Sequence, residues 1–266
     1  MSFFKPYCFA LLCAVMLMPA CAKKSETPVT SPAATTAVAC DGAVFQEKCV
    51  HKGDIVTFGK YPQATETPEP IEWLVLDIDT SKGQMLLLSK YVLDAKPYNT
   101  EDVSITWENS TLRTWLNDTF KTTAFTSSEQ QQIALTHLEN PDNPTYGTNG
   151  GNATDDKVFL LTIADAFNQT DDVEGSGRYF SSDAERQADA TRYAVQNGVG
   201  VIGSQSREIT NDGTCTDAHC FAFWWLRSPG RDANNAALVF DFAIVVGGGN
   251  VSDSSVGVRP ALWVKY

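Results

Sequence analysis

Hydrophobic and polar residues follow a strand-like pattern in the first half of the chain. Residues 54–63 (DIVTFGKYPQ) and 71–79 (IEWLVLDID) alternate with a period of about two, and residues 84–94 (QMLLLSKYVLD) form a nearly continuous apolar run. Alternation indicates a half-buried strand, and a short apolar run indicates a strand that is covered on both faces. We therefore predict three strands in this region, with a proline-rich loop between the first two.

The next segment changes to a helical spacing. Residues 110–120 (STLRTWLNDTF) place their apolar side chains on one helical face: Leu112, Trp115, Leu116 and Phe120. A second helix is predicted to begin at Thr126, because Thr126 and Glu129 have the spacing of a capping box. Phe125 precedes the cap, where it could act as a hydrophobic staple.

Two shorter helices are expected further along. Residues 156–167 (DKVFLLTIADAF) predict a strand that runs into a helix, and residues 191–198 (TRYAVQNG) predict a helix that ends at Asn197 and Gly198. The stretch 198–203, GVGVIG, matches the glycine spacing of a dinucleotide-binding loop. It follows a helix rather than a strand, so we interpret its glycines as structural.

The segment 140–156 (NPDNPTYGTNGGNATDD) has the composition of a long ordered loop. Its oxygen-bearing side chains could bind calcium: Asp142, Asn143, Asp155 and Asp156. The spacing differs from that of an EF-hand, because Pro144 occupies a ligand position and no glutamate closes the loop. We therefore assign no metal and predict a solvated loop, with calcium as the alternative.

The N-terminus has the pattern of an export signal. Residues 1–20 combine Lys5 with an apolar run and a small-residue exit, and MPAC resembles a bacterial lipobox ending at Cys21. Residues 21–39 are rich in Ser, Thr, Pro and Ala, which predicts a disordered tether. These features predict a domain at 40–266 that a lipid on Cys21 anchors to a bacterial membrane, at the outer membrane or cell surface. A simply secreted protein is the alternative.

Composition narrows the function. The chain is 43% hydrophobic, enough for a sizeable core, and its net charge of −12 argues against nucleic acid as a partner. No Walker A, HExxH or GxSxG motif occurs, and nothing places His51, His137 or His219 beside a nucleophile. We predict no enzymatic activity and no cofactor, and contact with the membrane only through the lipid.

Four cysteines remain for the domain: Cys40, Cys49, Cys215 and Cys220. An even number in an exported protein indicates disulfides. Three pairings are possible, and the short separations favour Cys40–Cys49 and Cys215–Cys220.

The C-terminal region carries a resemblance to a known family. The segments WWLRSPG and GVRPALW resemble the C-terminal block of bacterial surface lipoproteins with a C-type-lectin-like fold of the formylglycine-generating-enzyme type. FGKYPQ, PIEWLVLD, LLLSKYVLD, STLRTWLN and DKVFLL extend the similarity over residues 53–266. The resemblance implies an α+β fold of antiparallel strands, a few short helices and long ordered loops. Some of these proteins are variable proteins of diversity-generating retroelements, in which mutated adenines alter a ligand-binding face.

The segment 231–256 is compatible with such diversification. Mutation of the adenines in AAC or AAT codons never yields Lys, Glu, Gln, Met or Trp, and the segment contains none of the five. We predict that it forms a sequence-tolerant binding face for a protein or glycan ligand. The candidate contact residues are Arg231, Asp232, Asn234, Asn235, Leu238, Phe240, Asp241, Phe242, Ile244, Val246, Asn250, Ser252, Asp253 and Ser254.

Within this segment, Phe240, Phe242 and Ile244 alternate with smaller or polar residues and should point to one face of a strand. They form either an exposed apolar patch or part of the core, in which case Val239 and Val245 would lie on the other face. Gly247–Gly249 are expected to make a flexible or tightly turned corner. Packing around the face would come from a scaffold that includes Trp224, Trp225, Arg227 and Arg259.

Two rival interpretations remain. One is a lectin-fold surface lipoprotein without any diversification. The other is a copper oxidase of the formylglycine-generating type, because Cys215 and Cys220 have the spacing of that family's two catalytic cysteines. The family's residues on either side of the pair are missing here, and an exported CxxxxC sequence favours a disulfide.

Overall fold

The computed structural model describes residues 40–167, 177–201, 221–240 and 245–266. The chain divides into two units, Met1–Ala39 and Cys40–Tyr266, and only the second is described. The predicted signal peptide, the lipidation site at Cys21 and the tether therefore lie outside the described residues. Among the described helices, none has both the length and the apolar character needed to cross a membrane.

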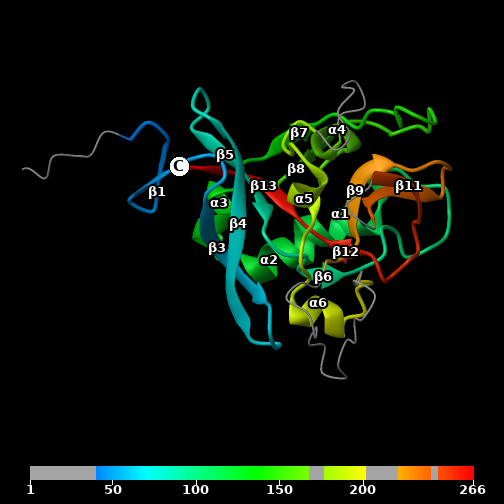
Figure 1. Ribbon diagram of the computed structural model, residues 1–266, viewed down its shortest axis with the longest axis horizontal. Helices are drawn as coiled ribbons and strands as arrows, with labels where there is room; N and C mark the ends of the chain where they lie inside the picture. Colours follow the sequence, from blue (N-terminus) through cyan, green and yellow to red (C-terminus); the bar gives the residue numbers. More distant parts are fainter. Residues whose placement is uncertain (1–39, 168–176, 202–220, 241–244) are drawn as a thin grey trace, which may run out of the picture. The chain divides into compact units, whose positions relative to one another are not determined.

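An antiparallel four-stranded sheet contains the three strands predicted in the first half of the chain (Figure 1). Its strand order is β13-β5-β4-β3, so the C-terminal strand pairs with β5. The apolar run of β5 is buried from Met85 to Ser89, as its composition predicts. The four strands are β3 (Ile55–Pro62), β4 (Pro68–Asp79), β5 (Gln84–Ser89) and β13 (Ala261–Lys265).

A second sheet has five strands in the order β11-β10-β9-β12-β6. Neighbouring strands are antiparallel except β12 and β9, which are parallel. β11 is therefore an edge strand that pairs with β10, and both strands belong to the segment 231–256. The five strands are β6 (Asp94–Ala95), β9 (Trp224–Pro229), β10 (Asn235–Val239), β11 (Val245–Asn250) and β12 (Gly257–Val258).

Short elements connect and flank these sheets. Two hairpin-like pairs are β1 (Ala43–Phe45) with β2 (Lys48–Val50), and β7 (Thr136–Leu138) with β8 (Thr154–Asp156). The helical elements are η1 (Trp107–Asn109), α1 (Thr111–Trp115), η2 (Leu116–Phe120), α2 (Lys121–Ala124), α3 (Ser127–Gln132), α4 (Ile163–Ala166), α5 (Asp183–Arg186) and α6 (Arg192–Gln196). The structure is thus a mixed α and β fold of mostly antiparallel sheets with short helices, as predicted for the coarse class.

The helix predicted at residues 110–120 is present, but it is not uniform. A π-helical turn, η2, separates α1 from α2. Leu112, Leu116 and Phe120 are buried as predicted. Trp115 is only partly buried, and the Lys96 ammonium lies 4.6 Å from its ring centroid.

The predicted cap of the next helix is confirmed, whereas the staple is wrong. Thr126 and Glu129 form a complete capping box at the start of α3. A staple would require an apolar partner one turn into the helix, where Gln130 instead donates a hydrogen bond from its side chain to the Phe125 carbonyl. The Phe125 ring packs on Phe58 in β3, with centroids 5.2 Å apart.

The strand predicted between Lys157 and Leu161 is replaced by irregular backbone. Phe159 makes an isolated bridge with Ala261, but side chains occupy neighbouring carbonyls. Asn117 donates to the Val158 carbonyl, and Arg227 donates to the Leu160 carbonyl. Such bonds take the place of a strand partner.

The two short helices follow the sequence prediction. α4 begins after Thr162, and α6 ends before Asn197 and Gly198, where Gly198 has a φ of 95°. The described part of GVGVIG, residues 198–201, follows α6. The remainder of that motif lies outside the described residues.

One hydrophobic cluster joins both sheets. Trp73 from the four-stranded sheet and Trp224 from the five-stranded sheet are each fully buried in it. The predicted disulfide between Cys40 and Cys49 is confirmed, with an S–S distance of 2.06 Å. Cys215 and Cys220 lie outside the described residues.

Candidate functional site

Arg227 ties the C-terminal sheet to the irregular segment beside it. Its side chain donates to the carbonyls of Leu160 and Glu139, at 2.7 and 3.3 Å, and it lies 3.8 Å from Asp165. Only 7% of the residue is exposed, and burial lowers the pKa of its guanidinium. These contacts suit the scaffold role that the sequence suggests.

Arg259 is buried, and its hydrogen-bond partners among the described residues are backbone carbonyls rather than carboxylates. It donates to the carbonyls of Ser89 and Arg186, at 3.0 and 3.1 Å, and its guanidinium carbon lies 5.0 Å from the Trp224 ring centroid. Burial lowers the pKa of Arg259 to about 9. Trp224 and Trp225 are fully buried beside β10, so this side of the sheet is densely packed.

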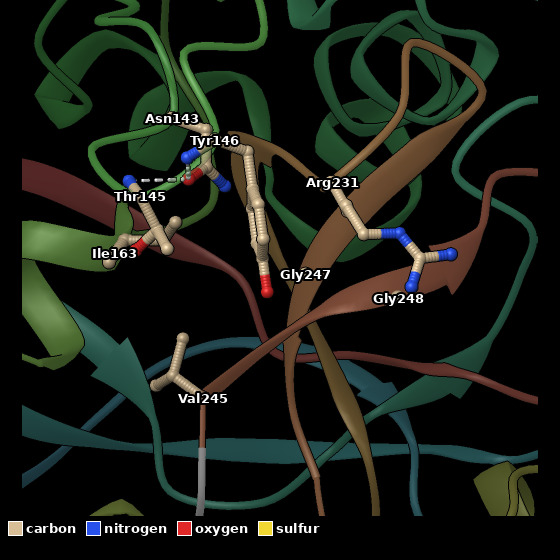
Figure 2. A pocket seen from close by; sticks show the side chains of 8 residues that line it. All are labelled: Asn143, Thr145, Tyr146, Ile163, Arg231, Val245, Gly247 and Gly248. Carbon is tan, nitrogen blue, oxygen red and sulfur yellow. Dashed lines mark hydrogen bonds between the residues drawn. The ribbon is translucent and has the colours of Figure 1, made fainter.

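A pocket of about 220 Å³ lies where the loop 140–156 meets the segment 231–256 (Figure 2). One wall comes from the loop and α4, and the other comes from residues flanking β10 and from β11. Its lining residues are Asn143, Thr145, Tyr146, Ile163, Arg231, Val245, Gly247 and Gly248.

The loop wall is fixed by Asn143, which is only 3% exposed. Its side-chain oxygen accepts hydrogen bonds from the backbone N–H groups of Thr145 and Tyr146, at 2.9 and 3.1 Å. Its amide donates to the Pro229 carbonyl at the end of β9, at 2.8 Å. The backbone that carries Tyr146 is thereby attached to the five-stranded sheet, although 53% of Tyr146 is exposed.

The opposite wall is formed by a bulge in β11. Ala236 pairs with Gly249 and Leu238 pairs with Val246, so Gly247 and Gly248 both lie opposite Ala237. The Gly247 carbonyl accepts a hydrogen bond from the Arg231 backbone N–H at 2.6 Å. The prediction of a glycine corner is therefore corrected, because these glycines belong to a bulged strand.

The glycine at position 247 allows the two walls to approach each other. A Cβ added there would lie 3.0 Å from Cε2 of Tyr146 and 3.1 Å from the backbone nitrogen of Arg231. Figure 2 shows the Tyr146 hydroxyl pointing toward Gly247, with Thr145 and Ile163 on one side of the ring and Arg231 on the other.

Arg231 is the one charged side chain among the described lining residues. Its side chain is 63% exposed, and its Nε donates to Oδ2 of the neighbouring Asp232 at 3.0 Å. Neither terminal nitrogen makes a hydrogen bond to any residue that the structure describes. The guanidinium therefore presents its two Nη groups to solvent at the rim of the pocket, on the side of Arg231 away from Tyr146 in Figure 2.

The other predicted polar contacts mostly shape turns. Asn250 accepts hydrogen bonds from the N–H and hydroxyl of Ser252, and Asp253 accepts the same pair of bonds from Ser255. Asn234 donates to Asp102, and Asn235 donates to the Asn234 carbonyl. Ser254 is exposed.

Phe240 directly follows the last residue of β10 and is not among the residues that line the pocket. Phe240 is 42% exposed and stacks on Phe223, with ring centroids 4.3 Å apart. Phe240 therefore corresponds to the exposed patch more closely than to the core.

Leu238 needs correction as a predicted ligand contact. It is only 4% exposed and packs beneath Gly249, where an added Cβ would lie 2.4 Å from Leu238 Cδ2. Asp241, Phe242 and Ile244 lie outside the described residues. Val246 pairs with Leu238 in β11, but its side chain is outside the described part of the structure.

The carboxylates around the loop 140–156 are engaged by protein groups. Asp142 accepts from the Gly150 N–H at 3.0 Å, and Asp155 lies 2.9 Å from the His137 ring nitrogen. Asp156 accepts from Arg113 and Trp107, at 2.7 and 2.9 Å. Each oxygen used in this way is less available to calcium, so the arrangement suits a loop held by its own hydrogen bonds.

Another group of potential metal ligands lies at the N-terminal end of the described unit. Ligand atoms of Asp41, Cys49 and His51 lie within 4.8 Å of one another. The Cys49 sulfur is bonded to Cys40, so it is not a thiolate. Asp41 instead pairs with His51 at 2.8 Å.

A larger groove, of about 630 Å³, lies between the four-stranded sheet and β7. Its charged side chains already have partners. Asp165 lies 3.2 Å from Arg178, Asp79 lies 3.3 Å from Lys82, and Glu139 pairs with His137. The smaller pocket is the stronger candidate for ligand binding because the terminal nitrogens of Arg231 have no hydrogen-bond partner among the described residues.

Residues 82–266 match a protein family described as a domain of unknown function, DUF6273. The match covers more than half of the chain. The chain belongs to the DUF6273 family. No curated protein matches it, and no solved structure does. The DUF6273 region begins at Lys82, between β4 and β5, and includes both walls of the pocket.

Of the residues that line the pocket, the sequence prediction of ligand contacts includes only Arg231. Arg231 was predicted as a contact, whereas Tyr146 in the loop of the DUF6273 region was not. A single aromatic residue within a loop of Asn, Gly, Pro and Thr is a usable signal, since such a ring has few neighbours to pack against. Ile163 and Val245 could not be found in this way, because both have ordinary positions in an apolar pattern.

Proposed function

We propose that residues 40–266 form a surface-displayed ligand-binding domain, and that the pocket between Tyr146 and Arg231 is its principal binding site. The observation that carries this proposal is the combination of an exposed ring and terminal guanidinium nitrogens that bond to none of the described residues, both on backbone that hydrogen bonds hold in place. Binding sites commonly unite an apolar contact with a few positioned polar groups.

Display at a bacterial surface rests on the N-terminal sequence. The export pattern of residues 1–20 and the lipobox resemblance at Cys21 support a lipid anchor, and residues 21–39 would tether the domain. We propose the C-type-lectin-like fold of the formylglycine-generating-enzyme type on the resemblance of WWLRSPG and GVRPALW. The antiparallel sheets and short helices agree with that proposal at a coarse level.

We also propose that a diversity-generating retroelement varies the segment 231–256. Its lack of Lys, Glu, Gln, Met and Trp supports this origin, as does the contribution of Arg231, Gly247 and Gly248 to the pocket. A near-copy of the 3′ end of the gene beside a reverse transcriptase gene would support diversification. Without such a copy the binding proposal still stands, for a domain of fixed sequence.

Phe240 supports a second candidate surface. Its ring is 42% exposed and stacks on Phe223, so an apolar partner could pack against it. The ligand could therefore bind on this face rather than in the pocket.

The proposal is tested by screening the protein against immobilised glycans and peptides. We expect Tyr146→Ala to weaken binding of the selected ligand at least tenfold, while Phe240→Ala and the control Tyr266→Ala bind like the wild type. Tyr266 is a suitable control because it is 37% exposed at the C-terminus and does not line the pocket. Loss of binding in Phe240→Ala alone would instead assign the function to the Phe240 face.

A further inference from the structure

We propose that the pocket recognises a carboxylate-bearing sugar ring of an acidic glycan, with Arg231 binding the carboxylate and Tyr146 contacting the ring. This inference rests on the proposed binding function and specifies its ligand class. It follows from the charge of Arg231, the volume of the pocket, and the presence of both the Arg231 guanidinium and the Tyr146 ring in its lining.

The positive charge of Arg231 in the pocket favours an anionic ligand. Arg231 is the charged side chain among the described lining residues, and the others are neutral. Its terminal nitrogens carry four N–H donors without a partner among the described residues. A guanidinium binds a carboxylate through two parallel hydrogen bonds, so a planar anion with two oxygens matches this group.

Asp232 does not block this role. Among the described residues, the Arg231 side chain bonds to Asp232 only through Nε. Nε lies on one side of the planar guanidinium, so the terminal nitrogen on the opposite side remains open to a ligand. Both side chains are more than half exposed, at 63% and 57%, and an exposed ion pair contributes little to stability. A ligand carboxylate can bind the Nη groups while this pair persists.

The backbone of Arg231 is held in position before any ligand binds. Its N–H donates to the Gly247 carbonyl at 2.6 Å, and its carbonyl accepts from the Thr148 hydroxyl at 2.7 Å. One bond comes from β11 and the other from the loop 140–156. Binding therefore orders mainly the side chain, which limits the entropy lost.

The volume of the pocket indicates that it holds a single sugar ring. The pocket volume of about 220 Å³ is below the range of roughly 300–1,000 Å³ that is usual for drug-sized ligands. It can hold one group of a longer ligand, with the rest lying on the exposed rim. The Tyr146 ring, 53% exposed, offers a flat surface for the C–H groups of such a ring.

These two contacts favour an acidic sugar over an acidic peptide. A uronic acid carries its carboxylate directly on a ring whose C–H face is apolar, so one small group uses both Arg231 and Tyr146. An aspartate or glutamate side chain has a carboxylate but no ring for Tyr146 to contact. A neutral sugar has the ring but leaves the guanidinium without an anion.

The test measures binding of tetragalacturonate and of its fully methyl-esterified form to the protein by titration calorimetry. Esterification removes the charge and keeps the ring. We expect the acid to bind at least tenfold more tightly than the ester, and Arg231→Gln to reduce acid binding to the level of the ester. Arg231→Lys should restore part of the affinity, because it keeps the charge without the planar fork.

Arg178→Gln is the matched control, because the Arg178 side chain is also 64% exposed but lies in the other groove. It should bind both forms like the wild type. Thermal melting of each variant will show that the fold is retained. Tyr146→Ala should weaken binding of the acid and of the ester alike.

Three results would overturn the inference, and they separate it from the proposed function. Equal binding of acid and ester, unaffected by Arg231→Gln but lost in Tyr146→Ala, leaves a binding pocket with a different ligand class. Preference for a glutamate hexapeptide over tetragalacturonate changes the class to an acidic peptide. No binding of either sugar, together with array ligands whose binding is insensitive to Tyr146→Ala, removes the pocket as the functional site.

Discussion

At the scale of single residues, two arginines meet one carboxylate in very different surroundings. Asp165 lies 3.2 Å from Arg178 and 3.8 Å from Arg227. The Arg178 side chain is 64% exposed, whereas that of Arg227 is 8% exposed and also bonds to carbonyls. The two contacts share the buried Asp165 carboxylate, so they differ in the exposure of the arginine, and removing a buried charge is more destabilising than removing an exposed one.

We therefore expect Arg227→Met to lower the free energy of unfolding by about 3–5 kcal/mol, since it leaves buried carbonyls without their donor and removes one of the two cations beside Asp165. Arg178→Met should cost less than about 1 kcal/mol. Urea denaturation of both variants measures the difference. Equal effects would show that Arg227 is not a scaffold residue.

Two adjacent glycines of β11, Gly248 in the bulge and Gly249 next to it, make a second residue-scale comparison. A Cβ at Gly249 would lie 2.4 Å from Leu238 and 2.5 Å from Trp225, whereas a Cβ at Gly248 would meet nothing within 4 Å. Gly249→Ala is expected to destabilise the protein by about 1–3 kcal/mol through overpacking, and Gly248→Ala to have little effect. Melting temperatures test this. A stable Gly249→Ala variant would contradict the close packing of β10 on β11.

Sequence predictability also varies residue by residue. The capping box at Thr126 and Glu129 was predictable because both partners are three residues apart and their chemistry is local. Burial of Leu238 was not, because alternation assigns it to the same face as Phe240. Whether that face is covered depends on Trp225, a neighbour on β9 that no local pattern identifies.

At the scale of elements, the β7–β8 pair contains a histidine with a shifted pKa. His137 and Asp155 are cross-strand partners, and the His137 ring nitrogen lies 2.9 Å from the carboxylate. The hydrogen bond to Asp155 raises the pKa of His137 above its ordinary value. A raised folded-state pKa stabilises the folded protein below the ordinary pKa, and that contribution is lost as pH rises through the folded-state pKa.

We expect Asp155→Asn to lower the pKa of His137 toward about 6.5, the value of an unperturbed histidine. An NMR titration of the ring protons measures this. His51 is the internal control, because its pKa is raised chiefly by the hydrogen bond to Asp41 and should not change. An unchanged pKa for His137 would show that the pairing with Asp155 is absent in solution.

Elements differ in how far the sequence predicts them. β3, β4 and β5 follow from alternation and apolar runs, because their pairing partners are close in the chain. The irregular backbone at residues 157–161 does not follow, because distant side chains from Asn117 and Arg227 occupy its carbonyls. The Tyr146 wall of the pocket was missed for a similar reason, since Asn143 attaches it to Pro229 far along the chain.

At the scale of the whole described unit, the DUF6273 match is shorter than the folded structure. It begins at Lys82, whereas β5 pairs with β4, which lies before that residue. Trp73 in β4 is fully buried and donates to the Phe58 carbonyl at 2.7 Å. The core of the domain therefore extends into residues that the family match does not include.

We expect a chain of residues 82–266 to lack a cooperative unfolding transition, because β5 would expose the edge and core face that β4 covers. Residues 40–266 should unfold cooperatively. Thermal denaturation followed by circular dichroism compares the two chains. Cooperative unfolding of 82–266 would show that β3 and β4 are accessory to the fold.

The position of the bound ligand tests the proposed site most directly, and NMR measures that position. Backbone amide signals of the protein are recorded while the ligand selected on the arrays is added. We predict that the largest shifts fall on Thr145, Tyr146, Arg231, Gly247 and Gly248, which line the pocket. Shifts that centre instead on Phe223 and Phe240, with those of the pocket residues unchanged, would contradict the central claim.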